Sequence, residues 1–305
     1  MDFNKTDFIK QRDIVNIKHI TDGWSNDEKF FMEDSKGCRF LLRLTKKKHL
    51  DEKLKDIRII KKINELHFNM SRLIEGGYSE ELDKAYMLFT WIDGVGLKEY
   101  IVGLNETEQF HMGLQSGQIL KMIHDIPVNE NDISSKNQVT KKQKQLEEYL
   151  SCNHRIHNDK CAVDYICQNL DLLNCVKSVY KHGDFHLGNL LFSDENGLGV
   201  IDFDRVGCGD GYSEFYKLQA FEVEISIPYS IGKIKGYFNG EPPENFWRLL
   251  KLYVAHSSLY SIKWAEEFGD DEINGMLRRY NDAAVDYDNF QRIIPKWYSD
   301  NKDNY

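Results

Sequence analysis

The first ninety residues alternate between apolar and polar positions in short runs, and turn-forming residues separate these runs. This pattern predicts antiparallel strands. Between the third and fourth runs, apolar residues recur three positions apart over 50–66, which predicts an amphipathic helix. A small curved sheet with one helix is therefore expected here. The strands are expected at 14–20, 29–33, 39–44, 72–76 and 85–91.

Beyond residue 94 the apolar spacing becomes helical. In the first of these helices, Gly113 and Gly117 stand among apolar residues, where a second helix can approach closely. Strands followed by helices predict an α+β chain with an N-lobe over 1–93 and a mainly helical C-lobe over 94–305. The helices are expected at 106–124, 136–150, 161–180, 210–225, 244–268 and 271–289.

One β-hairpin interrupts the helical half. Two apolar runs, 190–192 and 198–201, flank the polar turn 193–197. The sequence His-Gly-Asp-Phe-His-Leu-Gly-Asn over 182–189 precedes this hairpin, and Asp-Phe-Asp over 202–204 follows it. The hairpin reverses the chain, so these two flanking segments are expected to approach each other.

Three acceptor side chains in these segments have the spacing found in phosphoryl-transfer enzymes. Asp184 is a carboxylate able to take the proton of an acceptor hydroxyl. Asn189 and Asp202 offer an amide oxygen and a carboxylate, which are hard ligands suited to Mg²⁺. A polar turn that only caps two strands is the alternative, but the combined pattern favours catalysis.

Charge is unevenly distributed over the 305 residues, whose net charge is −9. Residues 1–93 hold 18 Lys and Arg against 17 Asp and Glu, whereas 94–305 hold 22 against 32. Such an acidic surface disfavours nucleic acid and favours either a cationic small molecule or simple solubility. Charges interrupt every apolar run, and the start resembles no secretory signal, so we expect a cytoplasmic protein without a membrane span.

In this order, these motifs resemble the aminoglycoside phosphotransferase and choline kinase family, small-molecule kinases with a two-lobed protein-kinase-like fold. The resemblance covers roughly residues 14–290 and is strongest over 182–189 and 201–204. His186 distinguishes the first motif from the corresponding loop of protein kinases. Phe203 stands where the family usually has Trp, which is a mild departure.

The resemblance implies a role for each catalytic residue. Asp184 would be the catalytic base, and His182 would brace its loop. Asn189 and Asp202 would hold Mg²⁺ against the phosphates of ATP or GTP.

The resemblance also implies a nucleotide site in the N-lobe. Arg43, on the strand over 39–44, stands where kinases carry their phosphate-binding lysine. Its acidic partner is expected to be Asp56 on the following helix, with Glu52 as the rival. The other expected nucleotide contacts are Ser25 and Asn26 in the first turn, and Phe89, Thr90 and Ile92 at the interlobe linker.

The implied activity is small-molecule O-phosphotransfer, with a polycationic acceptor of the aminoglycoside type and hence antibiotic resistance. Four late carboxylates are candidates for binding its ammonium groups: Glu266, Glu267, Asp270 and Asp271. Solvated helix ends explain these residues equally well. Two alternatives stay open, namely a housekeeping kinase for choline, ethanolamine, another amino alcohol or a sugar, and a nucleotide-binding regulator without turnover.

Overall fold

The computed structural model describes residues 6, 9, 11–21, 27–133 and 137–305, in two compact units. Residues 1–95 and 191–207 form the first unit, and residues 96–190 and 208–305 form the second. The predicted lobes divide the chain differently, because they assign 191–207 to the helical part. This segment packs with the first unit through β10 (Gly197–Val200), which pairs in parallel with β4 (Asn69–Met70).

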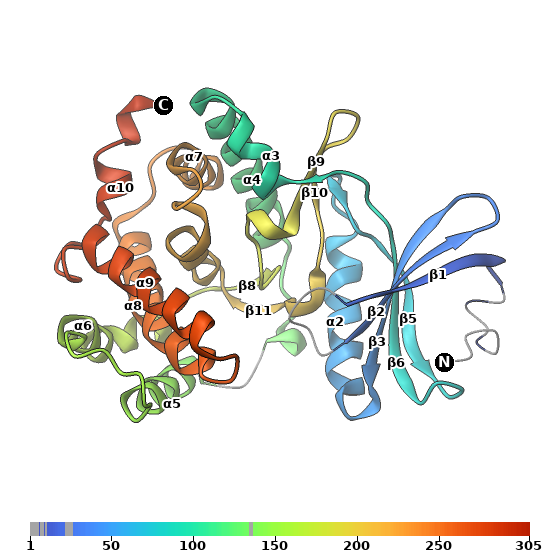
Figure 1. The fold of residues 1–305 in the computed structure, drawn as a ribbon, viewed down its shortest axis with the longest axis horizontal. Helices are drawn as coiled ribbons and strands as arrows, with labels where there is room; N and C mark the ends of the chain where they lie inside the picture. The colour runs from blue at the N-terminus through green and yellow to red at the C-terminus, as the bar shows by residue number, and fades with distance from the viewer. Residues whose placement is uncertain (1–5, 7–8, 10, 22–26, 134–136) are drawn as a thin grey trace. The chain divides into compact units, whose positions relative to one another are not determined.

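The first unit is built on a five-stranded sheet in the order β1-β2-β3-β6-β5, and each pair is antiparallel. Helix α2 (Leu50–Ile63) packs against β5 and β6, as the blue elements of Figure 1 show. The predicted strands and helix therefore form, with bounds shifted by a few residues. The strands are β1 Ile14–Ile20, β2 Glu28–Asp34, β3 Arg39–Lys46, β5 Leu73–Ser79 and β6 Lys84–Thr90.

The second unit is mainly helical, and a two-stranded sheet of β8 (Ser178–Lys181) and β11 (Gly207–Asp210) lies under the loop that follows β8. The principal helices are α4 Glu106–His124, α5 Gln138–Leu150, α6 Lys160–Asn169, α7 Ile227–Phe238, α8 Glu244–Ala265 and α9 Asp270–Asp286. Shorter helical segments lie between them, among them α3 Leu97–Tyr100, a 3-10 turn Ile101–Gly103 and α10 Lys296–Ser299.

Two predicted helices of this unit are wrong in part. The helix expected over 161–180 ends at Asn169, because the chain tightens into a 3-10 turn and then enters β8. The helix expected over 210–225 is replaced by a 3-10 turn at Gly211–Glu214 and a π-helix at Leu218–Glu222. Hydrogen bonds to neighbouring elements outweigh helical propensity in both segments.

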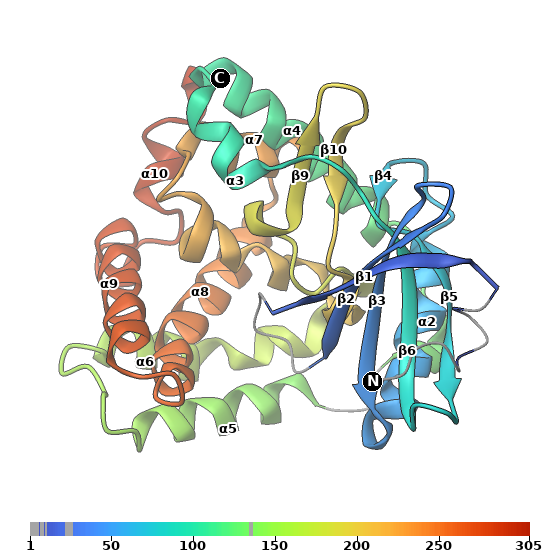
Figure 2. The same cartoon turned by 45° about the vertical axis from the view of Figure 1, so that its right-hand side comes forward.

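Helices α4 and α7 cross at very short distance (Figure 2), although α7 was not predicted. A Cβ atom added to Gly113 would lie 2.1 Å from the carbonyl oxygen of Tyr229, and one added to Gly117 would lie 2.1 Å from that of Lys233. On α7, Gly232 has the same relation to α4. The close helix approach expected at Gly113 and Gly117 is therefore present, because only glycine fits between the two backbones.

The predicted α+β class is confirmed, with the antiparallel sheet in the N-terminal part and the helices in the C-terminal part. Over the described residues, each helix is too short or too polar to cross a lipid bilayer.

Candidate active site

The loop that carries Asp184 lies between β8 and β9 (Leu190–Ser193), and hydrogen bonds among its own residues stabilise its conformation. His182 is fully buried, and its Nδ1 accepts a hydrogen bond from the backbone N–H of Asp184 at 3.2 Å. Asn189 Nδ2 donates to the carbonyl oxygen of Asp184 at 2.9 Å. The backbone of Asp184 is therefore held from both sides, which fixes the direction of its side chain.

The carboxylate of Asp184 forms an ion pair with Lys217, and its Oδ1 lies 3.6 Å from His186 Nε2. Lys217 is only 3% exposed. Burial lowers the pKa of Lys217 to about 7, helped by the nearby charges of Lys233 and Lys181 and opposed by Glu222. Sequence reasoning missed Lys217, because a lysine in an expected helix is typical of a solvated face.

A fully buried ion pair, between Lys233 and Glu222, forms hydrogen bonds to the same loop. Lys233 Nζ, on α7, lies 3.0 Å from both carboxylate oxygens of Glu222 and donates to the carbonyl oxygen of Phe185 at 3.1 Å. Glu222 Oε1 also accepts the backbone N–H of Leu187 at 3.1 Å. The pair thus ties α7 and the π-helix to the residues on either side of His186.

A second buried pair, between Glu214 and His124, anchors the start of the loop. Glu214 accepts hydrogen bonds from His124 Nε2 at 2.8 Å and from the backbone N–H of Gly183 at 2.7 Å. Burial acts to raise the pKa of Glu214, but the hydrogen bond and charge of His124 outweigh it and lower the pKa to about 2. Glu214 therefore stays ionised and holds Gly183 in its left-handed conformation, with φ of 85°.

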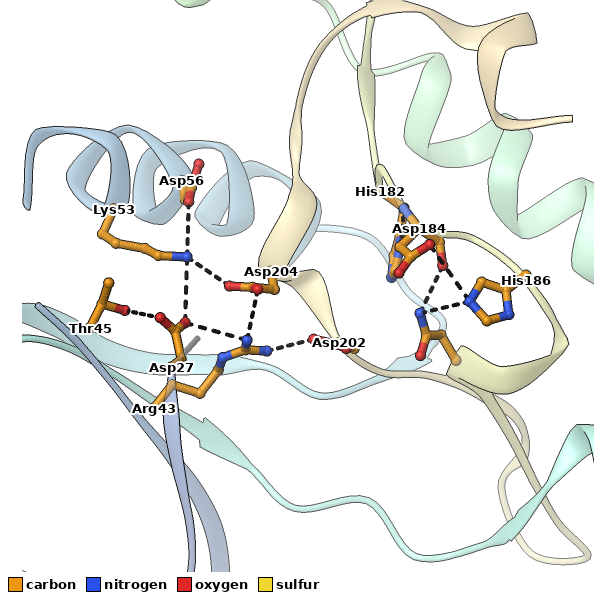
Figure 3. A network of polar contacts seen from close by, with 11 residues as sticks. Asp27, Arg43, Thr45, Lys53, Asp56, His182, Asp184, His186, Asp202 and Asp204 are labelled. Carbon is orange, nitrogen blue, oxygen red and sulfur yellow. Dashed lines mark hydrogen bonds and ion pairs between the residues drawn. The ribbon is translucent and has the colours of Figure 1, made fainter. Parts of the chain in front are cut away.

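In the first unit, Arg43 on β3 is the centre of a cluster of charges and is only 2% exposed (Figure 3). Its guanidinium lies 2.5 Å from Asp202, 2.9 Å from Asp204 and 3.4 Å from Asp27. Burial acts to lower the pKa of Arg43, but these three carboxylates raise it overall. Arg43 is thus a permanent buried cation.

The expected partner of Arg43 was wrong. Asp56 pairs instead with Lys53, at 3.6 Å, and Lys53 Nζ reaches Asp204 at 2.7 Å. Glu52 lies on the exposed side of α2, 3.6 Å from His49. Lys53 lies one helical turn before Asp56, so its ammonium group is the cation nearest to that carboxylate. Arg43 is held instead by Asp27, Asp202 and Asp204. Burial raises the pKa of Asp56 to about 6, although Lys53 opposes this effect.

Asp202 and Asn189 are the residues expected to hold a metal ion. Asp202 adopts the left-handed conformation, with φ of 63°, and its side chain is 32% exposed. Burial acts to raise its pKa, but Arg43 lowers it overall, so the carboxylate is ionised. Within the described residues, no three His, Cys, Asp or Glu side chains converge on a metal site. A carboxylate and an amide oxygen are each of the ligand type that Mg²⁺ prefers.

The expected purine contacts occupy the end of β6 and the residues beyond it. Phe89 is buried in the sheet, 3% exposed. The carbonyl oxygen of Thr90 already accepts a hydrogen bond from Ser71 Oγ at 2.8 Å, which leaves one lone pair for a ligand. Ile92 follows two residues later and is half-buried. Ser25 and Asn26 lie outside the described residues.

The four late carboxylates lie at helix ends. Glu266 accepts hydrogen bonds from Lys263 at 2.7 Å and from His154 Nδ1 at 2.9 Å. Glu267 is exposed after α8, and the exposed Asp270 and Asp271 form the first turn of α9, where the helix dipole favours negative charge. Local hydrogen bonds therefore account for Glu266, and the helix dipole accounts for Asp270 and Asp271.

Comparisons with known proteins identify a family and a shared fold. The sequence model described as the phosphotransferase enzyme family matches residues 16–247. A search of curated protein sequences finds no match.

Several solved structures share the fold at low sequence identity. The GDP complex of an aminoglycoside 2'-phosphotransferase-IIIa mutant is 15% identical, with a TM-score of 0.70 over 94% of this chain and 97% of that one. An amicoumacin kinase with AMP-PNP and Ca²⁺ is 13% identical, with a TM-score of 0.65 over 94% of each chain. A thermostable aminoglycoside phosphotransferase with ADP and hygromycin B is 15% identical, with a TM-score of 0.64 over 90% and 96%.

Proposed function

Because the chain belongs to the phosphotransferase enzyme family, we propose that it transfers the γ-phosphoryl group of a nucleoside triphosphate to a hydroxyl of a small molecule, in the cytoplasm. The observation that carries this proposal is the arrangement around Asp184. Its backbone is fixed by His182 and Asn189, and its carboxylate is held by Lys217. A protein that only bound nucleotide would not need a carboxylate positioned in this way.

Asp184 accepts the proton of the acceptor hydroxyl and orients that oxygen for attack. Lys217 pairs with this carboxylate and fixes the direction in which it points. Mg²⁺, when bound, neutralises charge that develops on the transferred group. We assign the role of metal ligand to Asn189 and Asp202, and the role of bracing the loop to His182.

We assign nucleotide binding to the first unit. Arg43 offers a buried guanidinium fork, which suits phosphate oxygens and is already held in direction by its carboxylates. Phe89, Thr90 and Ile92 are proposed for the base, and Ser25 and Asn26 for the phosphates. Solved structures of the same fold contain GDP, ADP or AMP-PNP, which supports a purine nucleotide such as ATP or GTP as the donor.

Two acceptor classes remain candidates. The solved structures with hygromycin B and amicoumacin support a cationic antibiotic. The position of the late carboxylates favours a smaller hydroxylated metabolite instead. Glu266 lies 13 residues beyond Tyr253, which corresponds to about 20 Å along a helix, and Tyr253 lines the cavity next to the Asp184 loop. Glu266 also has local partners of its own, Lys263 and His154, which supports a smaller acceptor.

The proposal is tested by following transfer from γ-labelled ATP and GTP to a panel of hydroxylated acceptors, with and without Mg²⁺. Phosphorylated acceptor that forms only with Mg²⁺ supports it. Asp202→Ala should shift the Mg²⁺ titration of nucleotide binding to higher concentration, because an oxygen ligand and its charge are lost. Nucleotide binding without transfer to any acceptor would contradict the proposal and favour a nucleotide-binding regulator without turnover.

A further inference from the structure

A cavity of about 170 Å³ lies beside the Asp184 loop, entirely within the second unit. Gly183 lines it next to Asp184 in the chain, and α5 and α8, which pack together in Figure 2, contribute its outer wall. Its most distinctive feature is its charge. Four lysines line it, against two carboxylates: Lys141, Lys142, Lys181 and Lys217, with Asp210 and Glu214.

The two carboxylates of the lining are engaged by other groups. Glu214 receives His124 Nε2 and the backbone N–H of Gly183. Asp210 accepts from the hydroxyl of Tyr253 at 2.7 Å and from the backbone N–H of Tyr212 at 3.0 Å. Both carboxylates therefore already accept hydrogen bonds from groups of the fold.

Two of the lysines have neutral hydrogen-bond partners, although the charges of Asp210 and Glu214 also act on Lys181. Lys142 Nζ lies 3.1 Å from His256 Nδ1 and 5.8 Å from the centre of the Tyr253 ring. Lys181 Nζ donates to Ser213 Oγ at 3.0 Å. Among the described residues, neither lysine has a carboxylate within 4.0 Å, although each lines a cavity whose other cations repel it. Burial, together with Lys141 and Lys181, lowers the pKa of Lys142 to about 7.

The fourth lysine joins this cavity to the reacting group, because Lys217 both lines the cavity and pairs with Asp184. A ligand held by the other lysines is thus held next to Asp184. The volume equals that of several water molecules, since each water occupies about 30 Å³ in the liquid. That is enough for a carboxylate or phosphate with the first carbons attached to it.

We propose that this cavity binds an anionic group of the acceptor, a carboxylate or a phosphate, so that the phosphorylated molecule is a hydroxylated anion rather than a polycation. That the bound anion is the acceptor rests on the proposed function. That the cavity binds an anion does not depend on it. Charge-assisted hydrogen bonds from Lys142 and Lys181 hold the anionic end, and a hydroxyl on a neighbouring carbon faces Asp184. The net negative charge of residues 94–305 does not predict this, because binding depends on the charges that line the cavity.

Four ligands on one six-carbon polyol chain test the inference: sorbitol, gluconate, sorbitol 6-phosphate and glucamine, which are neutral, carboxylate, phosphate and ammonium forms. Their dissociation constants are measured by calorimetry at pH 7 without nucleotide. We expect gluconate, sorbitol 6-phosphate or both to bind at least about tenfold more tightly than sorbitol, with glucamine weakest. The two anions distinguish a carboxylate from a phosphate source.

Variants identify the site. Lys142→Met and Lys181→Met should each weaken the binding of the tighter anion by about tenfold or more, and Lys142→Arg should retain it. Lys144→Met is the matched control. Lys144 lies on the same helix with its side chain 76% exposed, and it should leave the binding unchanged.

Equal binding of all four polyols, preference for glucamine, or an anion affinity that both variants leave intact would overturn the inference. Phosphoryl transfer to the same four ligands separates it from the proposed function. Transfer only to ammonium acceptors would contradict the inference and retain the kinase. Tight, lysine-dependent binding of an anion without transfer would support the anion site and contradict the kinase.

Discussion

Lys233 donates a hydrogen bond to the carbonyl oxygen of Phe185 at 3.1 Å, across 48 positions of sequence and with no exposed surface of its own. This contact joins α7 directly to the residue that follows Asp184, and the same ammonium group pairs with Glu222. A buried cation is costly unless it is paired, so the position of the loop and the stability of the second unit depend on the same pair.

Lys233→Met should lower the free energy of unfolding by about 3–5 kcal/mol, because it leaves Glu222 buried without its cation. Replacing Glu222 as well, by Leu, should restore much of that stability but not the turnover, because Phe185 still lacks its donor. Urea unfolding and kcat are measured on both variants. A single variant within about 1 kcal/mol of the wild type would show that the pair is not structurally important.

Gly117→Ala should destabilise the protein by about 1–3 kcal/mol, since the new methyl group would overlap the backbone of α7. Gly275→Ala is the matched control, because a Cβ atom there meets nothing within 4 Å and the residue lies inside α9. It should stabilise by about 0.5–1 kcal/mol, as alanine favours helix over glycine. Thermal unfolding of the two variants should therefore change in opposite directions. Equal shifts would contradict the close α4–α7 packing.

The strands of the first unit could be predicted because short apolar runs in the sequence are separated by turn-forming residues. Helix α7 could not. Pro228 and the glycines at 232 and 236 are typical of a loop. In the structure the proline begins the helix, where its missing N–H is not needed, and the glycines fit against α4. The proline and the two glycines that hide the helix in the sequence are therefore the residues that start it and pack it against α4.

The candidate site also contains residues that the sequence predicts and residues that it does not. The motif around Asp184 and Asp202 is visible because its residue types are fixed by chemistry. Lys217, Lys233 and Lys142 are not visible, since a lysine in a helical pattern is normally solvated and only the tertiary structure buries it. The partner of Arg43 was wrong for a related reason. Asp27, Asp202 and Asp204 come from distant segments, and their approach to Arg43 depends on the sheet and the hairpin.

Arg43→Met should weaken nucleotide binding by about tenfold or more, because a hydrogen bond to a charged group contributes about 1.5–3 kcal/mol. Three carboxylates would also lose their shared cation and repel the phosphates. Arg39→Met on the same strand is the control, since Arg39 forms an exposed pair with Asp93. It should change affinity very little. Equilibrium titration with a fluorescent nucleotide compares the two, and equal affinities would remove Arg43 from the nucleotide site.

Lys142→Met should stabilise the protein at neutral pH, and this gain should disappear as the pH rises. Burial lowers the pKa of Lys142 to about 7, so between pH 7 and 10.5 the unfolded chain binds a proton that the folded protein releases. The wild-type lysine therefore destabilises most below pH 7. The groups that face it are Lys141, Lys181, His256 and Tyr253.

The gain is expected to be on the order of 1–3 kcal/mol at pH 6 and to approach a constant small value near pH 10. Urea unfolding across this range measures it for Lys142→Met, with Lys144→Met as the reference. A difference independent of pH would show that Lys142 is not titrating near neutrality.

The most direct test of the account is the turnover of Asp184→Asn, measured as γ-phosphoryl transfer to an acceptor that the wild type phosphorylates. The amide keeps the size of the side chain but cannot take the hydroxyl proton. We predict that kcat falls by about 10²–10⁴-fold, while the dissociation constant of the nucleotide changes by less than about twofold. Turnover close to that of the wild type would contradict the assignment of Asp184 as the catalytic base.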